Sequence, residues 1–257
     1  MNYLDAILLA IVEGITEFLP ISSTGHLILT TKLLNIAESE FVKTFEIVIQ
    51  LGAILAIVFL YKDKLLQGPK VWKNIIIAFI PTGIIGLTVY DFVKNVLLGS
   101  AAITVISLFV GGVIILLLEK YYQSDKSSDV EIEDLPISKT IALGVIQTIA
   151  VIPGVSRSGA TIFGGMFMGF SRKTAADFSF LLAIPTMMAA SGYDLLKSGS
   201  NFSQSELMIL MVGFIGSFIV AYIVVKQLLK YIQNHTFAIF GWYRIVLAAA
   251  YWLLILR

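Results

Sequence analysis

Long apolar stretches alternate with short polar segments along the whole chain. Six of the stretches are long enough to cross a lipid bilayer as single helices, because a spanning helix needs about 20 mostly apolar residues. They cover residues 45–61, 75–92, 101–118, 178–193, 207–225 and 237–256. The pattern therefore predicts an all-α membrane protein with six transmembrane helices.

Two further apolar segments, residues 4–34 and 141–170, are interrupted in the middle by proline, glycine, serine and threonine. The interruptions read FLPISSTGHL in the first segment and IPGVSRSGAT in the second. Non-helical backbone at membrane depth is stable only where protein buries it or where it lines a wet cavity. We therefore expect two re-entrant helical hairpins, each made of two half-helices that enter and leave the membrane on the same side.

The two halves of the chain resemble each other at an offset of about 133 residues. Phe45 in KTFEIVIQLGAILA aligns with Phe178 in ADFSFLLAIPTMMA, and Glu13 falls opposite Gln147 after one position of drift. These matches predict a single polytopic membrane domain. Its two repeats would cover about 1–122 and about 139–257, joined by a cytoplasmic loop at about 123–138.

Each predicted repeat holds one hairpin and three spans. Because three is odd, the second repeat is expected to be inverted relative to the first. Inverted repeats place a polar site where their broken helices meet. Chance similarity between apolar helices is the alternative.

Composition supports the membrane assignment. Of the 257 residues, 58% are apolar and 14% are charged, whereas soluble domains are about one quarter charged. The formal net charge of +1 gives no argument for nucleic acid as a partner, so none is expected. Cysteine is absent, which excludes disulfides and thiolate metal sites.

The distribution of lysine sets the expected orientation, because Lys and Arg concentrate in cytoplasmic loops. Lys62, Lys64, Lys70 and Lys73 cluster in one short loop, which we place in the cytoplasm. Alternation of the spans then opens the first hairpin to the outside and the second to the cytoplasm. The acidic stretch at 125–134 is expected to be a solvated, mobile cytoplasmic loop.

Glu13 and Glu17 are four residues apart, so both carboxylates project from one face of the first half-helix. Like charges at that spacing repel, and each needs a partner in an apolar setting. A divalent cation or a nearby arginine would supply it. The alternative is that both side chains face the headgroup region of the membrane.

A polar cluster follows directly, formed by Ser22, Ser23, Thr24, Gly25 and His26. Its place at the start of the next half-helix offers backbone N–H groups to an anion, and glycine permits close approach. Hydroxyls beside a histidine suit nucleophilic attack on phosphorus or proton transfer. Helix capping alone is the alternative.

Arg157 is the charged residue in the second interruption, where Ser156 and Ser158 flank it and Thr161 follows one turn later. An arginine at membrane depth indicates a functional site, and its planar guanidinium suits phosphate. The serines and the threonine would bind phosphate beside it. The alternative is a structural ion pair between Arg157 and one of the two glutamates.

Three other polar residues have weaker signals. Glu46 and Gln50 repeat the four-residue spacing on a predicted span, where they would support the first hairpin from behind. Arg244 lies in the last apolar stretch beside two aromatic residues, and we expect it to extend its charge to the membrane interface.

Together these residues have the chemistry that phosphoryl transfer requires. The reaction needs negative charge neutralised on phosphate oxygens, an in-line nucleophile and help for the leaving group. A cation at the glutamates with Arg157 would meet the first need. Ser23 would meet the second, with Glu17 or His26 as its base, and His26 could also act as an acid. The residues alone predict an anionic, phosphorylated and lipid-accessible substrate.

Two strings are specific enough to indicate a family. EGITEFLPISSTGHL (13–27) and PGVSRSGATI (153–162) resemble the motifs of undecaprenyl-pyrophosphate phosphatases of the bacitracin-resistance type. The resemblance implies a phosphatase that depends on Mg²⁺ or Ca²⁺ and recycles the lipid carrier of wall synthesis. It would convert undecaprenyl pyrophosphate to the monophosphate at the outer face of the bacterial inner membrane. Membrane lipids and a possible homodimer are the other expected partners. The family's essential positions fall on Glu13, Glu17, Ser22, Ser23, His26, Ser156, Arg157 and Thr161.

The order of roles within the site stays open at this point. Ser23 is the preferred nucleophile, with direct attack by water or His26 as alternatives. Glu17, Ser23, His26 and Arg157 are the expected catalytic residues. A transporter or flippase for undecaprenyl phosphate is the alternative function, because inverted repeats with broken helices are common in transporters. A phosphatidic-acid-phosphatase type enzyme, which STGH suggests, is disfavoured because that family's lysine motif and second histidine motif are missing.

Overall fold

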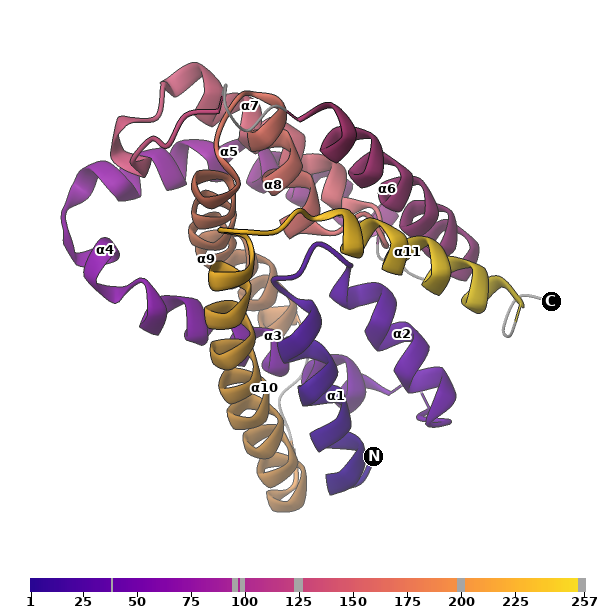
Figure 1. The fold of residues 1–257 in the computed structure, drawn as a ribbon. Coiled ribbons are helices and arrows are strands. Elements are labelled where there is room, and N and C mark those ends of the chain that lie inside the picture. Colours follow the sequence, from indigo (N-terminus) through magenta and orange to yellow (C-terminus); the bar gives the residue numbers. More distant parts are fainter. Residues whose placement is uncertain (38, 94–96, 98–99, 123–126, 198–201, 254–257) are drawn as a thin grey trace.

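The computed structural model describes residues 1–37, 39–93, 97, 100–122, 127–197 and 202–253 (Figure 1). The elements in chain order are α1 (Tyr3–Thr16), α2 (Ser23–Leu33), α3 (Glu40–Leu60), α4 (Lys62–Leu66), α5 (Pro69–Phe92), α6 (Ala101–Tyr121), the 3₁₀ helix η3 (Ile132–Asp134), α7 (Ile137–Gln147), the 3₁₀ helix η4 (Thr148–Val151), α8 (Arg157–Phe167), α9 (Arg172–Lys197), α10 (Gln204–Tyr231) and α11 (Ala238–Tyr251). These described ranges contain no strand, and one isolated bridge joins Ser128 to Phe170. The predicted all-α fold class is confirmed.

Five helices among the described residues are long and apolar enough to cross a membrane. They are Glu40–Leu60, Pro69–Tyr90, Ala101–Tyr121, Arg172–Leu196 and Gln204–Tyr231, and they correspond to five of the six predicted spans. The sixth prediction, 237–256, coincides with α11, and its residues 254–256 lie outside the described part. The protein is therefore a multi-pass membrane protein, while the count of six spans stays a prediction.

The outer surface of α5 shows why these helices suit lipid. Ile80, Ile84 and Leu87 are each exposed over half or more of their surface. Contiguous apolar surface of this kind is rare on soluble proteins, because exposing it to water is costly. Hydrocarbon chains remove that cost.

Both interrupted segments form pairs of helices joined by irregular backbone. α1 and α2 pack together across the break at 17–22, and α7 and α8 pack together beyond η4 (Figure 1). Each break ends in a serine with positive φ, 71° at Ser22 and 75° at Ser156. Non-glycine residues rarely adopt this conformation, so its repetition 134 positions apart shows that the two breaks share one local geometry. Their re-entrant placement in a bilayer stays a prediction.

Contacts between the two halves are reciprocal. α1 packs on α10, and its counterpart α7 packs on α5, the counterpart of α10. Likewise α3 packs on α10 and α9 packs on α5, while α3 meets α9 and α6 meets α11. Two repeats related by a two-fold axis produce this pattern, so the packing agrees with the predicted repeat. The repeat boundaries and the inversion across the membrane stay predictions.

The connection between the halves, predicted as a loop at 125–134, is anchored to the core at two points. Residues 125–126 lie outside the described part, but Ile132 and Leu135 are only 1% and 4% exposed. Asn74 on α5 donates a hydrogen bond of 2.7 Å to the carbonyl oxygen of Ile132. These two apolar side chains anchor an otherwise acidic and largely exposed segment in the core, while its mobility and its cytoplasmic side stay predictions.

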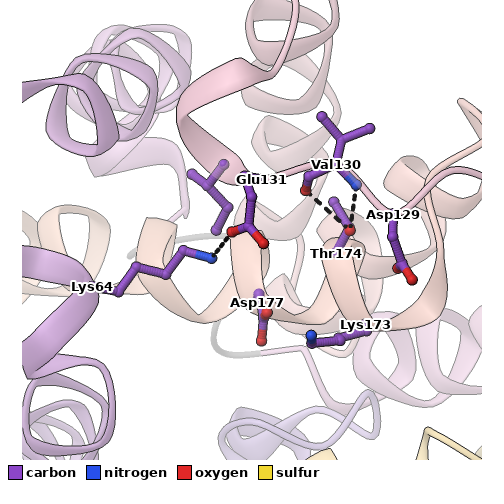
Figure 2. A pocket seen from close by; sticks show the side chains of 8 residues that line it. Lys64, Asp129, Val130, Glu131, Lys173, Thr174 and Asp177 are labelled. Atoms are coloured by element: carbon purple, nitrogen blue, oxygen red, sulfur yellow. Dashed lines mark hydrogen bonds and ion pairs between the residues drawn. The ribbon is translucent and has the colours of Figure 1, made fainter. Parts of the chain in front are cut away.

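Polar contacts hold the same segment against α4 and α9 (Figure 2). Lys64 pairs with Glu131 at 2.9 Å, and the backbone N–H of Val130 donates to the hydroxyl of Thr174 at 3.2 Å. Glu131 is well exposed, and its hydrogen bond to Lys64 lowers the pKa of the carboxyl group. With Asp177 these groups surround a cavity of about 70 Å³, enough for a few water molecules. The segment is therefore a packed linker.

Candidate functional site

The two helix breaks lie directly against each other at the centre of the molecule. The hydroxyl of Ser158, in the first turn of α8, donates a hydrogen bond of 2.9 Å to the carbonyl oxygen of Leu19 in the first break. Beside this contact, Arg157 and Glu17 form an ion pair whose closest atoms, Nη2 and Oε1, are 3.3 Å apart. Residues from the two predicted motifs thus form one polar cluster.

Glu17 joins the two motifs through its two carboxylate oxygens. Oε2 accepts a hydrogen bond of 2.6 Å from the hydroxyl of Ser23, and Oε1 faces the guanidinium group of Arg157. Glu17 and Ser23 are buried, at 7% and 8% exposure. A carboxylate in this position can accept the proton of the serine while the arginine balances its charge.

Two hydrogen bonds fix Arg157 in place, and its Nε–H remains without an acceptor in the described part of the chain. Its Nη1 donates to the carbonyl oxygen of Ser179 at 2.9 Å, and its guanidinium group lies 5.6 Å from the ring centre of Phe18. Its Nε–H has no acceptor among the described residues. The ion pair with Glu17 that the alternative interpretation predicted is present. The Nε–H without an acceptor is still available to donate a hydrogen bond to a phosphate oxygen.

The other hydroxyls of the second hairpin are bonded within the protein. The hydroxyl of Ser156 accepts from the N–H of Gly159 at 3.1 Å and lies 3.0 Å from the hydroxyl of Ser158. The hydroxyl of Thr161 lies 2.6 Å from that of Ser179. These groups shape the break, and their expected contact with phosphate stays a prediction.

The first hairpin shows the same capping. The side chain of Ser22 accepts from the N–H of Gly25, at a long 3.5 Å. A Cβ atom at Gly25 would meet Leu108 and Thr104 at 3.4 Å, so α2 begins close against α6. Thr24 is half-buried beside them. Ser22 therefore caps α2 and its contact with phosphate stays a prediction, while the hydroxyl of neighbouring Ser23 points to Glu17.

Glu13 is the most unusual residue of the site. It is 0% exposed, and neither carboxylate oxygen has a hydrogen-bond partner among the described residues. Glu17 and Glu46 are near enough for their charges to act on it, and Gln50 lies half-buried one turn beyond Glu46 on α3. A buried carboxylate without donors requires a cation or a proton.

This arrangement fits the expected Mg²⁺ or Ca²⁺. The free oxygens of Glu13 are hard ligands of the type that both ions prefer. In the described part of the chain, no three acidic or histidine side chains converge closely enough to form a metal site alone. Mg²⁺ commonly takes one or two carboxylates and completes its shell with water and substrate phosphates, so this finding is compatible with it.

His26 has hydrogen-bond partners on both ring nitrogens. Nδ1 lies 2.7 Å from the carbonyl oxygen of Ser22, and Nε2 lies 2.7 Å from the hydroxyl of Tyr243 on α11. The two rings are parallel within 2°, with centres 5.6 Å apart. The sequence patterns did not identify Tyr243, since the contact joins residues 217 positions apart.

Arg244 is the second residue whose role the sequence did not reveal. It is 1% exposed rather than extended to the membrane interface, so that expectation is wrong. Its guanidinium group donates to five backbone carbonyl oxygens, those of Pro20, Ser107, Leu108, Gly154 and Val155. The acceptors come from both breaks and from α6, so one side chain ties all three together.

A pair of glycines makes room for this arginine. A Cβ atom at Gly111 would lie 2.1 Å from Nη2 of Arg244, and one at Gly112 would lie 2.7 Å from the carbonyl oxygen of Gly241. The sequence signal that could have revealed the contact is the Gly-Gly pair in one apolar stretch and a lone arginine in another.

Comparison with known proteins places this geometry in context. The sequence profile of the bacitracin resistance protein BacA matches residues 6–250. The undecaprenyl-diphosphatase of Aquifex aeolicus is 54% identical over 98% of both chains. Those of Sulfurihydrogenibium sp. and Persephonella marina are 51% and 46% identical, over at least 98% of each chain. Similarity therefore extends through both breaks and α11.

Proposed function

The chain belongs to the bacitracin resistance protein BacA family, and from this membership we propose that it hydrolyses undecaprenyl diphosphate to undecaprenyl phosphate and inorganic phosphate. The relatives that it matches over nearly their whole length are named undecaprenyl-diphosphatase. The structural observation that carries the proposal is Glu17, which joins the hydroxyl of Ser23 to the guanidinium group of Arg157.

The geometry suits attack by Ser23 on the terminal phosphorus. Glu17 accepts the proton as the bond from Ser23 Oγ to phosphorus forms. The anhydride P–O bond then breaks, and undecaprenyl phosphate leaves. Water cleaves the phosphoserine in a second step, which releases inorganic phosphate and restores the hydroxyl.

Arg157 supplies charge where the reaction develops it. Its Nε–H is free to bond a phosphate oxygen, while Nη1 and Nη2 hold the group to Ser179 and Glu17. A donor fixed before the reaction stabilises the transition state without reorganising during it. The N-terminus of α8, which begins at Arg157, adds positive dipole at the same place.

His26 fits proton transfer better than direct attack. Both of its ring nitrogens have partners in the structure, whereas the hydroxyl of Ser23 points to a base. Attack by a water molecule that Glu17 activates is the remaining alternative to Ser23. Trapping of a phosphoserine at Ser23 distinguishes the two routes.

Glu13 and Glu17 would hold the divalent cation, and Glu46 and Gln50 would support them. When bound, Mg²⁺ or Ca²⁺ would neutralise charge on phosphate oxygens. The two unpartnered oxygens of Glu13 support this assignment.

The relatives' name favours hydrolysis over the transporter alternative. The site supports the same choice, since binding a lipid phosphate requires no serine hydrogen-bonded to a carboxylate. We also propose that the protein lies in the bacterial inner membrane with its site open to the outer face. Five apolar helices support the membrane, and the lysines clustered at 62–73 support the orientation, because Lys and Arg concentrate in cytoplasmic loops. A homodimer stays a prediction.

Phosphate release from undecaprenyl diphosphate by the purified protein in detergent tests the proposal. We expect turnover by the native chain and by Glu40→Gln, which alters an exposed ion pair with Lys43. Glu17→Gln should be severely impaired at equal expression. A folded native protein that releases no phosphate from this lipid would remove the proposed function.

A further inference from the structure

α11 contributes to the site from the far end of the chain. It runs alongside α6, as Figure 1 shows, and brings the hydroxyl of Tyr243 to within 2.7 Å of Nε2 of His26. His26 is 9% exposed, whereas Tyr243 is 43% exposed. The tyrosine therefore lies between the histidine and the outside of the protein.

The partners of His26 determine which ring nitrogen carries the proton. The carbonyl oxygen of Ser22 can only accept, so Nδ1 of the ring donates to it. In the neutral imidazole Nε2 is then unprotonated and accepts from the hydroxyl of Tyr243. The same carbonyl oxygen accepts the backbone N–H of His26 at 3.3 Å, so the start of α2 holds it in place beside the ring.

Arg244 fixes the position from which Tyr243 acts. Its donors reach Pro20, Gly154 and Val155, so the adjacent residue of α11 is tied to both breaks at once. The rings of Tyr243 and His26 are also parallel within 2°. Because Arg244 anchors this part of α11 to both breaks, the hydroxyl of Tyr243 has a defined place beside His26.

From these contacts we infer that Tyr243 is a positioning residue for phosphate hydrolysis, which orients the His26 imidazole and keeps its Nε2 unprotonated as a hydrogen-bond acceptor. The inference rests on the proposed function, because it assigns His26 to proton transfer in that reaction. Tyr243 acts through His26.

Tyr243→Phe tests the inference, since it removes the hydroxyl and keeps the ring. We expect kcat to fall by about tenfold, the typical effect of one lost hydrogen bond, with KM within about twofold of the native value. Tyr222→Phe, which removes a hydroxyl from another half-exposed tyrosine on α10, is the matched control and should keep full activity. Thermal unfolding should give similar midpoints for both variants.

The imidazole nitrogens supply a readout that does not depend on activity. The chain has two histidines, so selective ¹⁵N-histidine labelling gives one set of signals for His26 and one for exposed His235. In Tyr243→Phe the Nε2 signal of His26 should move toward that of an unbonded ring nitrogen, while the signals of His235 stay unchanged.

Unchanged kcat in Tyr243→Phe would overturn the inference. A fall in kcat with unaltered His26 signals would overturn it as well, because the tyrosine would then act without the histidine. If the native chain released no phosphate, the proposed function would fail, yet the nitrogen signals would still decide whether Tyr243 sets the state of the imidazole.

Discussion

Glu17→Gln removes the charge that joins Ser23 to Arg157 while it preserves the size of the side chain. The serine then loses the base 2.6 Å away, and removal of a general base typically slows a reaction by about 10²–10⁴-fold. Arg157→Gln removes the Nε–H donor, and a hydrogen bond to a charged group contributes about 1.5–3 kcal/mol. At 1.36 kcal/mol for each factor of ten, that loss lowers kcat/KM by about 10–100-fold.

The double variant tests whether the pair acts as one unit. Because Glu17 and Arg157 contact each other, each single change also disturbs the other residue, and the losses should not multiply. We expect Glu17→Gln/Arg157→Gln to lie within about tenfold of the weaker single variant. The assay is kcat/KM for phosphate release from undecaprenyl diphosphate, at matched folding by thermal unfolding. A double variant whose loss equals the product of the two single losses would refute the shared site.

Three further predictions test other parts of the site. Ser23→Ala should abolish the labelled phosphoserine that denaturing quench traps in the native protein, and native turnover without any such species would favour direct attack by water. EDTA should stop phosphate release, added Mg²⁺ or Ca²⁺ should restore it, and Glu13→Gln should need more cation for half-maximal rate; equal cation dependence in both proteins would separate Glu13 from the metal. A cysteine at Lys197 should react with an impermeant thiol reagent in intact cells and one at Lys70 should not, since the chain has no native cysteine to interfere. The opposite labelling pattern would reverse the orientation.

Local patterns predicted the framework of the fold. The length of each apolar stretch gave five spans that match α3, α5, α6, α9 and α10. Proline, glycine and serine in the two interrupted segments predicted the breaks that separate α1 from α2 and α7 from α8. The spans and the breaks depend only on neighbouring residues and on the thickness of the bilayer, so they can be predicted from the sequence alone.

The composition of the site was also visible in the motifs, but its pairings were not. Glu17 and Arg157 were each expected to need a partner of opposite charge, and their contact joins residues 140 positions apart. The sequence favoured Ser23 over Ser22 as the nucleophile, but it did not show which contacts separate the two hydroxyls. The positive φ of Ser22 turns its own side chain to a backbone cap and leaves Ser23 to face Glu17.

Only the tertiary structure assigned roles to α11 and to the linker between the halves. Arg244 has the sequence appearance of an interfacial arginine, yet helix packing brings five carbonyl oxygens around it and buries it. Ile132 lies in an acidic stretch, yet it is buried in the hydrophobic core. In both cases the deciding factor is which groups from distant segments surround the side chain. The length of the apolar stretches and the spacing of apolar residues therefore determined which helices form. The packing of those helices determined the partners of each polar side chain.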